Sequence, residues 1–482
     1  MLGIPLTAAI IALLAVVPAS AATLRLDGAV AGEALGASVS AAGDFNGDGH
    51  EDLVVGAPQA SPAGHLHAGA AFVVLGPLAP GERTLGGQGV VPISGSRAGG
   101  VVGSSVAAAG DVNGDGLDDV VIGAPGAAPN QEGPRGPAGR AYVVFGSPTP
   151  TPVDLAALGA RGFAVIGEQR PFPDAFGWSV TGVGDVNRDG RDDVAIAAPG
   201  NEGFEDTASP GRAYVVFGRR SSSTVRTSAL GAHGIRLTGG SNGGMRSVAP
   251  AGDVDHDGRA DVLIGDTGAQ HGFGGAFILR GRGPARRAVR DTIAIRGAQK
   301  YGDAGYAVAG GADLDGDGLP DLVITAPQGR RSGTRAAGSA WVVSGTAARR
   351  SIDLSRPRAG VRELRGRPGD YAGFAVAIAG RADADRNRDV ALLAGGSVAV
   401  IRGRRASGLQ RLANLTSGVG WWLDGTIEDG SFYTTPGAGG FTTVGPGGDF
   451  DGDGRSEVVA GARFADHGGA DSGSAYVFFA GT

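Results

Sequence analysis

The sequence predicts an all-β fold, a seven-bladed β-propeller of four-stranded blades that is closed by the N-terminal strand pairing with the last blade. Three observations predict it. A phrase of the form AAGDFNGDGHEDLVVGAP, first met at residues 41–58, recurs through the chain at intervals of roughly 60 to 75 residues. Each unit holds short apolar runs with the composition of strands, and no helical period is evident after the N-terminal segment.

Composition excludes several classes of protein. The chain has 482 residues and 91 glycines without a Gly-X-Y period, which excludes collagen, and its 42% hydrophobic content excludes wholesale disorder. A net charge of -6 argues against a nucleic-acid partner. With no cysteine, disulfides, thiolate metal sites and catalytic thiols are impossible. The length therefore suits one large repeat architecture, which we expect to be monomeric.

Residues 1–21 predict a cleaved signal peptide. An apolar run covers residues 4–17, and Ala19-Ser20-Ala21 has the small-x-small pattern that signal peptidase cleaves, although a basic segment before the run is missing. A retained membrane anchor is the alternative, but the run is short for a bilayer span. We expect a secreted or cell-surface protein without a membrane span in the mature chain, residues 22–482.

Each unit contains four expected strands. A first strand of small residues, such as 35–39, leads to the aspartate phrase, and a second strand often ends in Gly-Ala-Pro, as at 56–58. A third follows the pattern Gly-x-Ala-aromatic-Val-Val, as at 139–146, and a fourth resembles 235–238. The predicted blades are residues 31–96, 97–168, 169–240, 241–298, 299–367, 368–427, and 428–482 together with 22–30.

The two chain ends predict a closed ring. The chain stops just after a third-type strand, and residues 23–28 resemble a strand of the fourth type. Pairing the N-terminal strand with the last blade would remove two exposed edges. An open array or two separate sandwiches is the alternative.

Six units carry an acidic loop with the pattern Asp-x-(Asn/Asp)-x-Asp-Gly-x-x-Asp, ending in Glu in the last of them. With position 7 included for its carbonyl oxygen, the candidate ligands at positions 1, 3, 5, 7 and 9 are Asp44, Asn46, Asp48, His50, Asp52; Asp111, Asn113, Asp115, Leu117, Asp119; Asp185, Asn187, Asp189, Arg191, Asp193; Asp253, Asp255, Asp257, Arg259, Asp261; Asp313, Asp315, Asp317, Leu319, Asp321; and Asp449, Asp451, Asp453, Arg455, Glu457.

The spacing of these residues predicts about six calcium ions. Calcium takes six to eight oxygen ligands, and alternate residues can turn their oxygens toward one ion while glycine at position 6 allows a sharp turn. Magnesium fits such a crowded site poorly, and zinc lacks His or Cys side chains at the ligand positions. The alternative is a set of metal-free Asx-Gly turns. We expect no calcium in the sixth unit, where Asp383, Asp385 and Asn387 are followed by Arg388 and the loop is two residues shorter.

The repeats resemble the FG-GAP repeats of the integrin α-subunit headpiece. Phe176-Gly177 and Gly56-Ala57-Pro58 are similar to the two signatures of that repeat, and the acidic loops are similar to its calcium loops. The resemblance implies calcium loops between strands one and two on one face, with partners docking on the opposite face. Aromatic residues that could contact such partners are Phe172, Phe273, Tyr301, Tyr371, Phe432 and Tyr433.

These observations favour a secreted calcium-binding module for adhesion or ligand binding, whose partner is an unknown extracellular protein or glycan. Two alternatives stay open: a hydrolase or polysaccharide lyase built on a calcium-stabilised propeller, and a structural component of the cell surface. The seven histidines are scattered and most clustered carboxylates lie in the acidic loops, so we predict no catalytic residues and no organic cofactor.

Overall fold

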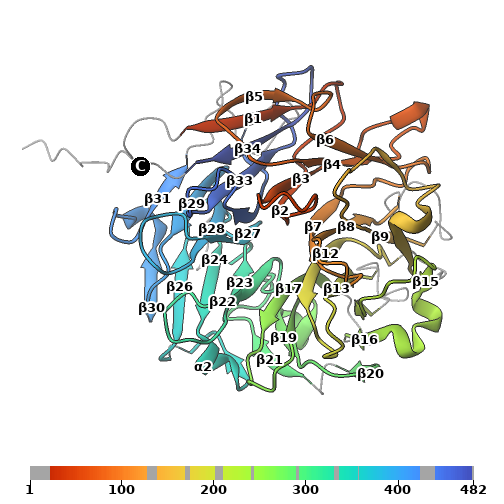
Figure 1. Cartoon of the computed structure of the whole chain (residues 1–482). Helices are drawn as coiled ribbons and strands as arrows, with labels where there is room; N and C mark the ends of the chain where they lie inside the picture. The colour runs from red at the N-terminus through yellow and green to blue at the C-terminus, as the bar shows by residue number, and fades with distance from the viewer. Residues whose placement is uncertain are drawn as a thin grey trace, which may run out of the picture.

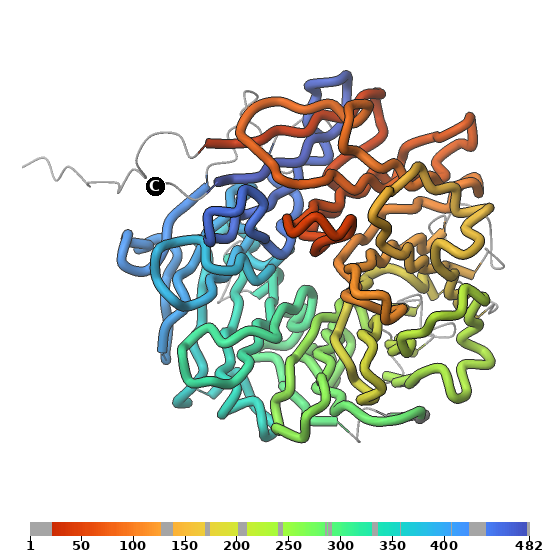
Figure 2. The backbone as a smooth tube through the Cα atoms, in the orientation of Figure 1, coloured from red at the N-terminus to blue at the C-terminus, as the bar shows by residue number. Residues whose placement is uncertain are grey.

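The computed structural model describes residues 22–126, 138–168, 174–200, 210–239, 244–288, 292–329, 336–356, 358–405, 407–423 and 440–479. Seven sheets stand around a ring in this part of the chain (Figure 1). The tube passes once around the ring, which brings the red N-terminal strand beside the blue C-terminal blade (Figure 2). The predicted seven-bladed propeller is confirmed. The predicted signal peptide, residues 1–21, lies outside the described residues.

The innermost strand of each blade contacts the innermost strands of both neighbouring blades, which closes the ring. These first strands are β2 (Ser38–Gly43), β7 (Ser105–Gly110), β12 (Ser179–Gly184), β17 (Met245–Gly252), β22 (Val308–Ala312), β27 (Val376–Gly380) and β32 (Thr443–Gly448). The second strands are β3 (Asp52–Ala57), β8 (Asp119–Ala124), β13 (Asp193–Ala198), β18 (Asp261–Asp266), β23 (Asp321–Ala326), β28 (Asp389–Ala394) and β33 (Glu457–Ala462).

The outer strands continue each antiparallel sheet. The third strands are β4 (Ala70–Val74), β9 (Arg140–Val144), β14 (Arg212–Val216), β19 (Gly275–Leu279), β24 (Ser339–Val343), β29 (Ser397–Ile401) and β34 (Ser474–Phe478). The fourth strands, for blades one to seven, are β6 (Val90–Ser94), β11 (Gly162–Ile166), β16 (Gly234–Thr238), β21 (Ile293–Arg296), β26 (Val361–Arg365), β31 (Gly420–Leu423) and β1 (Thr23–Asp27). Within the described ranges, helix is confined to single turns, including α1 (Ala269–Gly272) and α2 (Gly345–Ala348).

The N-terminal strand β1 closes the seventh blade, as predicted. It pairs antiparallel with β34, with Thr23 opposite Phe478 and Asp27 opposite Ser474. The hydroxyl of Ser474 also donates a hydrogen bond to Asp27 at 2.8 Å. The first and last parts of the chain therefore complete one sheet.

Six sheets also carry a fifth strand that the sequence did not predict. It comes from the connection between the third and fourth strands of the following unit and pairs in parallel with the fourth strand, so that it covers the outer edge. These edge strands are β10 (Val153–Asp154), β15 (Val225–Arg226), β20 (Ala285–Ala288), β25 (Ile352–Asp353), β30 (Gly408–Arg411) and β5 (Gly81–Thr84). Blade six has four strands in the described part of the chain.

The hydrophobic core consists of clusters between neighbouring blades. Val54 of β3 packs in one cluster with Ile122 and Tyr142 of blade two, whereas Leu53 and Val55 pack in another with residues of blade seven. Successive side chains of a strand point to opposite faces, and both faces of these sheets are covered. This burial explains why the second strands are uninterrupted apolar runs rather than alternating ones.

The two glycines of the repeat signatures meet across the interface between blades. A Cβ atom on Gly56 would lie 2.1 Å from the carbonyl oxygen of Gly103 in the next blade, and one on Gly123 would lie 2.1 Å from the carbonyl oxygen of Gly177. A side chain at either position would push the blades apart. Glycine is therefore required where the backbones approach this closely.

Candidate metal sites

The acidic loops lie at one face of the propeller. Each connects a first strand to a second strand, as between β2 and β3 or between β17 and β18. Because the first strands line the ring in the same direction, their C-terminal ends, and with them the loops, share one face, which we call the loop face. All predicted ligand positions fall in the described residues.

The first aspartate organises each loop through the backbone. Its Oδ2 atom accepts a hydrogen bond from the N–H of the position 6 glycine in all six loops, at 2.8 to 2.9 Å. That glycine has a positive φ, for example +87° at Gly49. These bonds wrap the loop around the first carboxylate, which brings positions 3 and 5 to the same side. Each loop therefore also forms the hydrogen-bonded turn that the metal-free alternative, a set of Asx-Gly turns, predicts.

Positions 5 and 7 are linked in every loop. The N–H group of the residue at position 7 donates to Oδ1 of the aspartate at position 5, at 2.8 to 3.1 Å, as from His50 to Asp48. This bond holds the position 5 carboxylate beside the loop. The proposed use of the position 7 carbonyl as a ligand stays a prediction.

The carboxylate at position 9 is fully buried and ties three parts of a blade together. The two oxygens of Asp261 accept hydrogen bonds from Val254 N at 3.0 Å and from Gly281 N at 2.7 Å. The same pair of bonds recurs in blades one to five, and also at Asp389 of blade six. Each carboxylate oxygen has a second lone pair, so position 9 can hold the backbone and still bind a cation. This structural role was not predicted.

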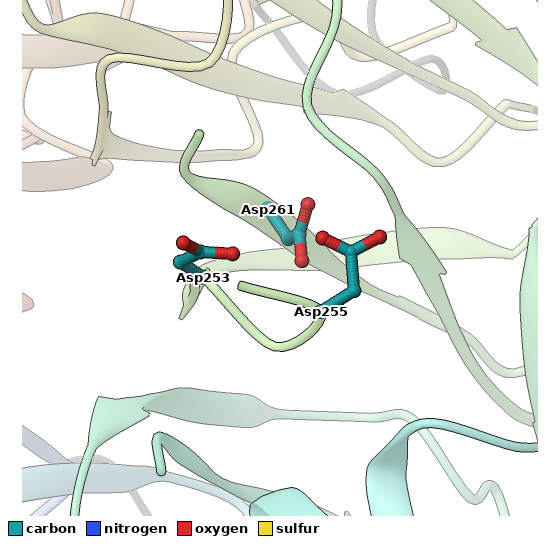
Figure 3. A group of neighbouring side chains, drawn as sticks. All are labelled: Asp253, Asp255 and Asp261. Carbon is teal, nitrogen blue, oxygen red and sulfur yellow. The ribbon is translucent and has the colours of Figure 1, made fainter. Parts of the chain in front are cut away.

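In three loops, acidic side chains gather closely enough to share one cation. They are Asp253, Asp255 and Asp261; Asp313, Asp315 and Asp321; and Asp449, Asp451 and Asp453. In each group, one carboxylate oxygen from each of the three residues lies within 4.8 Å of the other two. Figure 3 shows the first group beside its loop. Ligands on opposite sides of a calcium ion are about 4.6–5.2 Å apart, since each Ca–O distance is about 2.3–2.6 Å. The spacing therefore matches a calcium shell.

Unpartnered buried oxygens add a second indication of a cation. Asp255 Oδ1, Asp449 Oδ1 and Glu457 Oε1 are buried and accept no hydrogen bond. A buried carboxylate oxygen without a partner is costly, and a divalent ion would satisfy it. The donor set is entirely hard oxygen, which suits calcium better than zinc. The loops of blades four and seven thus fit a bound cation.

Loops one to three differ because asparagine stands at position 3. The Nδ2 atoms of Asn46, Asn113 and Asn187 donate to the aspartate at position 5 at 2.8 to 3.0 Å. An asparagine offers one oxygen as a ligand, and the choice between its oxygen and nitrogen follows from the surrounding network. These loops have one less negative charge than loops four, five and seven, so we expect weaker cation binding there.

Burial makes the position 9 carboxyl groups hard to ionise. Desolvation, reinforced by the neighbouring loop carboxylates, raises the pKa of Asp52 to about 6 and that of Asp119 to about 8. The pKa values of Asp193, Asp261 and Asp321 rise to about 7, and that of Glu457 to about 8, for the same reasons. A bound cation would compensate both the burial and the repulsion.

Blade six replaces the acidic loop by an internal ion pair. Arg402 Nε lies 3.0 Å from Asp383 Oδ2, and Asn387 Nδ2 donates to the carbonyl oxygen of Gly403 at 2.9 Å. The guanidinium therefore supplies positive charge beside Asp383, in a loop that is two residues shorter and lacks the glycine of position 6. This arrangement gives a physical reason to expect no calcium in blade six. Arg280 occupies the equivalent place in blade four, with Nε 3.1 Å from Asp255 Oδ2, but that loop keeps its full length, its glycine and its four carboxylates, so the shortened loop is what sets blade six apart.

Position 8 carries a link between blades that was not predicted. The carboxylates of Glu51, Asp118 and Asp192 accept hydrogen bonds from the N–H of the first loop residue in the preceding blade, at 2.9 to 3.1 Å. A Cβ on Gly43 would lie 2.2 Å from Asp118 Oδ2, which explains the glycine before Asp44. A hint was present in the sequence, because acidic pairs occur at positions 8 and 9 of the first three loops.

The opposite face holds three of the aromatic residues predicted as partner contacts, Phe273, Tyr301 and Tyr371. Tyr301 is 73% exposed with Lys300 Nζ 5.0 Å from its ring centre, Phe273 lies under Arg296 at 3.8 Å, and Tyr371 stacks on Phe374 at 6.0 Å. Phe172, Phe432 and Tyr433 lie outside the described residues. Among the helices that the structure describes, none is long and apolar enough to cross a membrane.

Five segments of the chain match the family model described as FG-GAP repeat: residues 35–74, 102–144, 176–216, 304–343 and 441–478. The chain is 29% identical over 240 residues to integrin alpha-4 of Xenopus laevis, covering 48% of this chain and 20% of the relative. It is 33% identical over 159 residues to human phosphatidylinositol-glycan-specific phospholipase D, covering 32% of this chain and 18% of the relative. The matches thus span about a fifth of the length of these relatives.

One solved structure, a rhamnogalacturonan lyase of Bacillus licheniformis, aligns with 92% of this chain and 71% of its own, at 13% identity and a TM-score of 0.41. Similarity at that level supports no argument about activity.

Proposed function

We propose that this FG-GAP repeat protein, whose propeller resembles that of integrin α subunits, is a secreted calcium-binding module for adhesion or ligand binding. Calcium would stiffen the loop face, and the opposite face would contact an extracellular protein or glycan. The observation that carries the proposal is the set of six acidic loops on one face, three of which gather carboxylates at the spacing of a calcium shell.

Six ions fit the charge of these loops. The ligand positions hold 21 carboxylates, three in each of the first three loops and four in each of the others, against twelve positive charges on six divalent ions. Burial, reinforced by mutual repulsion, raises the pKa at position 9. Cations that bind only the folded chain stabilise it by mass action. Such ions would supply stability in a chain without cysteine, in which no disulfide can form.

The similarity to integrin alpha chains supports the proposed role in adhesion, which is tested by binding. The mature protein, residues 22–482, is to be screened against extracellular proteins and glycans with calcium and with a chelator. We expect at least one ligand that binds only in calcium. Its binding should weaken when residues on the face opposite the loops are substituted. Ligands mapping solely to the loop face would contradict the proposal.

Export is tested separately by the N-terminus of the secreted chain. Cleavage after Ala21 predicts that the mature protein begins at Ala22, which mass spectrometry of the culture medium would show. A chain that keeps residues 1–21 in the membrane fraction would contradict the predicted signal peptide.

A hydrolytic activity is the second candidate, favoured by the similarity to a phosphatidylinositol-glycan-specific phospholipase D. Because the matched part spans 18% of that relative, the similarity concerns the repeats and not the relative's whole activity. Turnover of glycosylphosphatidylinositol lipids by the purified chain would support this candidate, whereas binding without turnover would support the adhesion module.

A further inference from the structure

A cavity of about 1430 Å³ runs along the inside of the ring. Its walls are the first strands, and its two ends lie roughly 20 Å apart, since six strand residues rise about 3.3 Å each. The acidic residues among the described lining, Glu51 and Asp449, belong to the loop face. The other end, which we call the mouth, has a different chemistry.

One position of the repeat supplies the side chains that surround the mouth. It lies two residues before the first valine of each inner strand, at the end opposite the acidic loops. The residue there is large in blades three to six and small in blades seven, one and two. From blade three onward the residues are Trp178, Arg246, Tyr306, Phe374, Thr442, Ala37 and Ser104. The mouth is therefore asymmetric at this position, with large side chains forming an aromatic arc on blades three to six and small side chains on blades seven, one and two.

Arg246 is held at the centre of the aromatic arc. Its guanidinium carbon lies 4.9 Å from the ring centre of Trp178 and 4.3 Å from that of Tyr306, and Nη2 donates to the Tyr306 hydroxyl at 3.2 Å. Stacking fixes the guanidinium without using its in-plane N–H groups. Four of its five N–H donors have no partner among the described contacts. They are available to a bidentate acceptor such as a carboxylate.

A second arginine stands across the ring. Arg463 follows β33 of blade seven, lines the same cavity, and donates its backbone N–H to Thr442 Oγ1 at 3.3 Å. The two guanidinium groups therefore belong to blades four and seven, with the small residues of blades one and two beside them. Positive charge without a neighbouring carboxylate in this part of the lining favours an anionic ligand.

The aromatic residues of the mouth favour a ligand made of rings over one made of a flexible chain. Trp178 is 43% exposed, Tyr306 packs edge-on against Phe374 at 5.2 Å, and Tyr371 extends the row. Such a strip can stack on successive sugar rings, whereas an acidic peptide needs only the guanidinium groups. The cavity also exceeds the roughly 300–1,000 Å³ of sites for small ligands, which favours a segment of a polymer.

We propose that the mouth binds an acidic polysaccharide, with Arg246 holding a sugar carboxylate and Trp178 stacking on the ring. The proposal rests on the binding function proposed above and names the class of its ligand. Arg463 would hold a second carboxylate across the mouth, and the polymer would pass over the small side chains of Ala37 and Ser104. Tyr306 positions Arg246 through the hydrogen bond and the stack.

The test is calorimetric titration with oligogalacturonate in calcium buffer. The control ligand is the same oligosaccharide with its carboxyl groups methyl-esterified, and the peptide control is poly-glutamate. We expect the acidic sugar to bind at least tenfold more tightly than either control, and the binding to weaken as salt rises. Equal affinity for the esterified sugar, or tighter binding of poly-glutamate, would overturn the proposal without requiring any variant.

Variants locate the site. Arg246→Met keeps the aliphatic stem, and we expect it to lower the affinity at least tenfold, as Trp178→Ala should. Arg356→Met is the control, because Arg356 has an 85% exposed side chain and does not line the cavity. An unchanged affinity in Arg246→Met, with an unchanged melting temperature, would overturn the proposal.

The two proposals fail differently. If no acidic sugar binds but a screened ligand is lost in Arg246→Met, this proposal falls while the binding function stands. If every screened ligand survives both mouth variants and maps to the loop face, both fall.

Discussion

Asp389→Ala separates the structural role of the position 9 carboxylate from its proposed role as a metal ligand. Asp389 belongs to blade six, whose loop lacks the metal pattern, yet its oxygens accept hydrogen bonds from Ala382 N at 3.1 Å and from Gly403 N at 3.0 Å. The side chain is fully buried. The substitution therefore leaves two buried N–H groups without an acceptor in a blade where we expect no calcium.

The expected loss follows from these two bonds. A buried donor left unsatisfied costs about 1–3 kcal/mol, so the free energy of unfolding should fall by about 2–6 kcal/mol. The unfolding entropy of a chain this long is on the order of 1 kcal/mol per kelvin, from about 2 cal/mol/K per residue. For a cooperative transition, the melting temperature should drop by roughly 2–6 °C.

The pH dependence of this loss has a definite sign. Burial, reinforced by Asp383 and Asp385, raises the pKa of Asp389 to about 7. A carboxyl group with a raised folded-state pKa stabilises fully below its unfolded pKa of about 4 and loses that contribution as pH rises through about 7. The loss caused by Asp389→Ala should therefore be larger at pH 5.5 than at pH 8.5.

Differential scanning calorimetry with calcium and with EDTA completes the test. Asp389→Ala should lower the melting temperature equally in both buffers. The comparison variant is Asp253→Ala, because Asp253 accepts its hydrogen bonds from exposed loop N–H groups of Asp257 and Gly258. It should change little in EDTA and should lose stability only in calcium. A calcium-dependent loss in Asp389→Ala would refute the reasoning.

Three further predictions concern the cations and the ion pair. Chelation should lower the melting temperature on the order of 15 °C, since a ligand at one hundred times its Kd adds about 2.7 kcal/mol per site; an unchanged melting curve in EDTA would rule out structural ions. The rise in melting temperature caused by calcium should be larger at pH 8 than at pH 5.5, because Asp261 and Glu457, with pKa values of about 7 and 8, must lose protons to bind the ion. An equal rise at both pH values would exclude position 9 from the calcium ligands. Arg402→Met should cost about 1 kcal/mol or less with and without calcium, because the pair with Asp383 is partly exposed; a gain of calcium-dependent stability would show that removing the arginine creates a cation site.

The propeller could be predicted because the repeats are regular. Seven copies of one phrase fix the number of blades, and the spare strand at residues 23–28 matches the one missing from the last unit. The prediction did not depend on an alternation of apolar and polar residues along the strands, which is weak here because both faces of each blade are buried. The edge strands escaped prediction because some have only two residues, as Val153–Asp154 does, and such a length carries no periodicity.

The sequence shows the acidic pattern of the loops, but not the contacts that connect them to the rest of each blade. The ligand pattern lies within nine residues of sequence, whereas Arg402 reaches Asp383 from 19 positions away and Gly281 reaches Asp261 from 20. Only the folded blade brings such pairs together.

The mouth shows the same limit. Trp178, Arg246 and Tyr306 occupy equivalent positions in successive units, so an alignment of the units would have found them. That they stack on one another follows only from the closed ring, which places neighbouring inner strands side by side.

The central claim is that six loops each hold one calcium ion and that blade six holds none. Elemental analysis of the mature protein, after dialysis to remove loosely bound ions, measures the number directly. The account predicts about six calcium ions per chain, while two or fewer would contradict it.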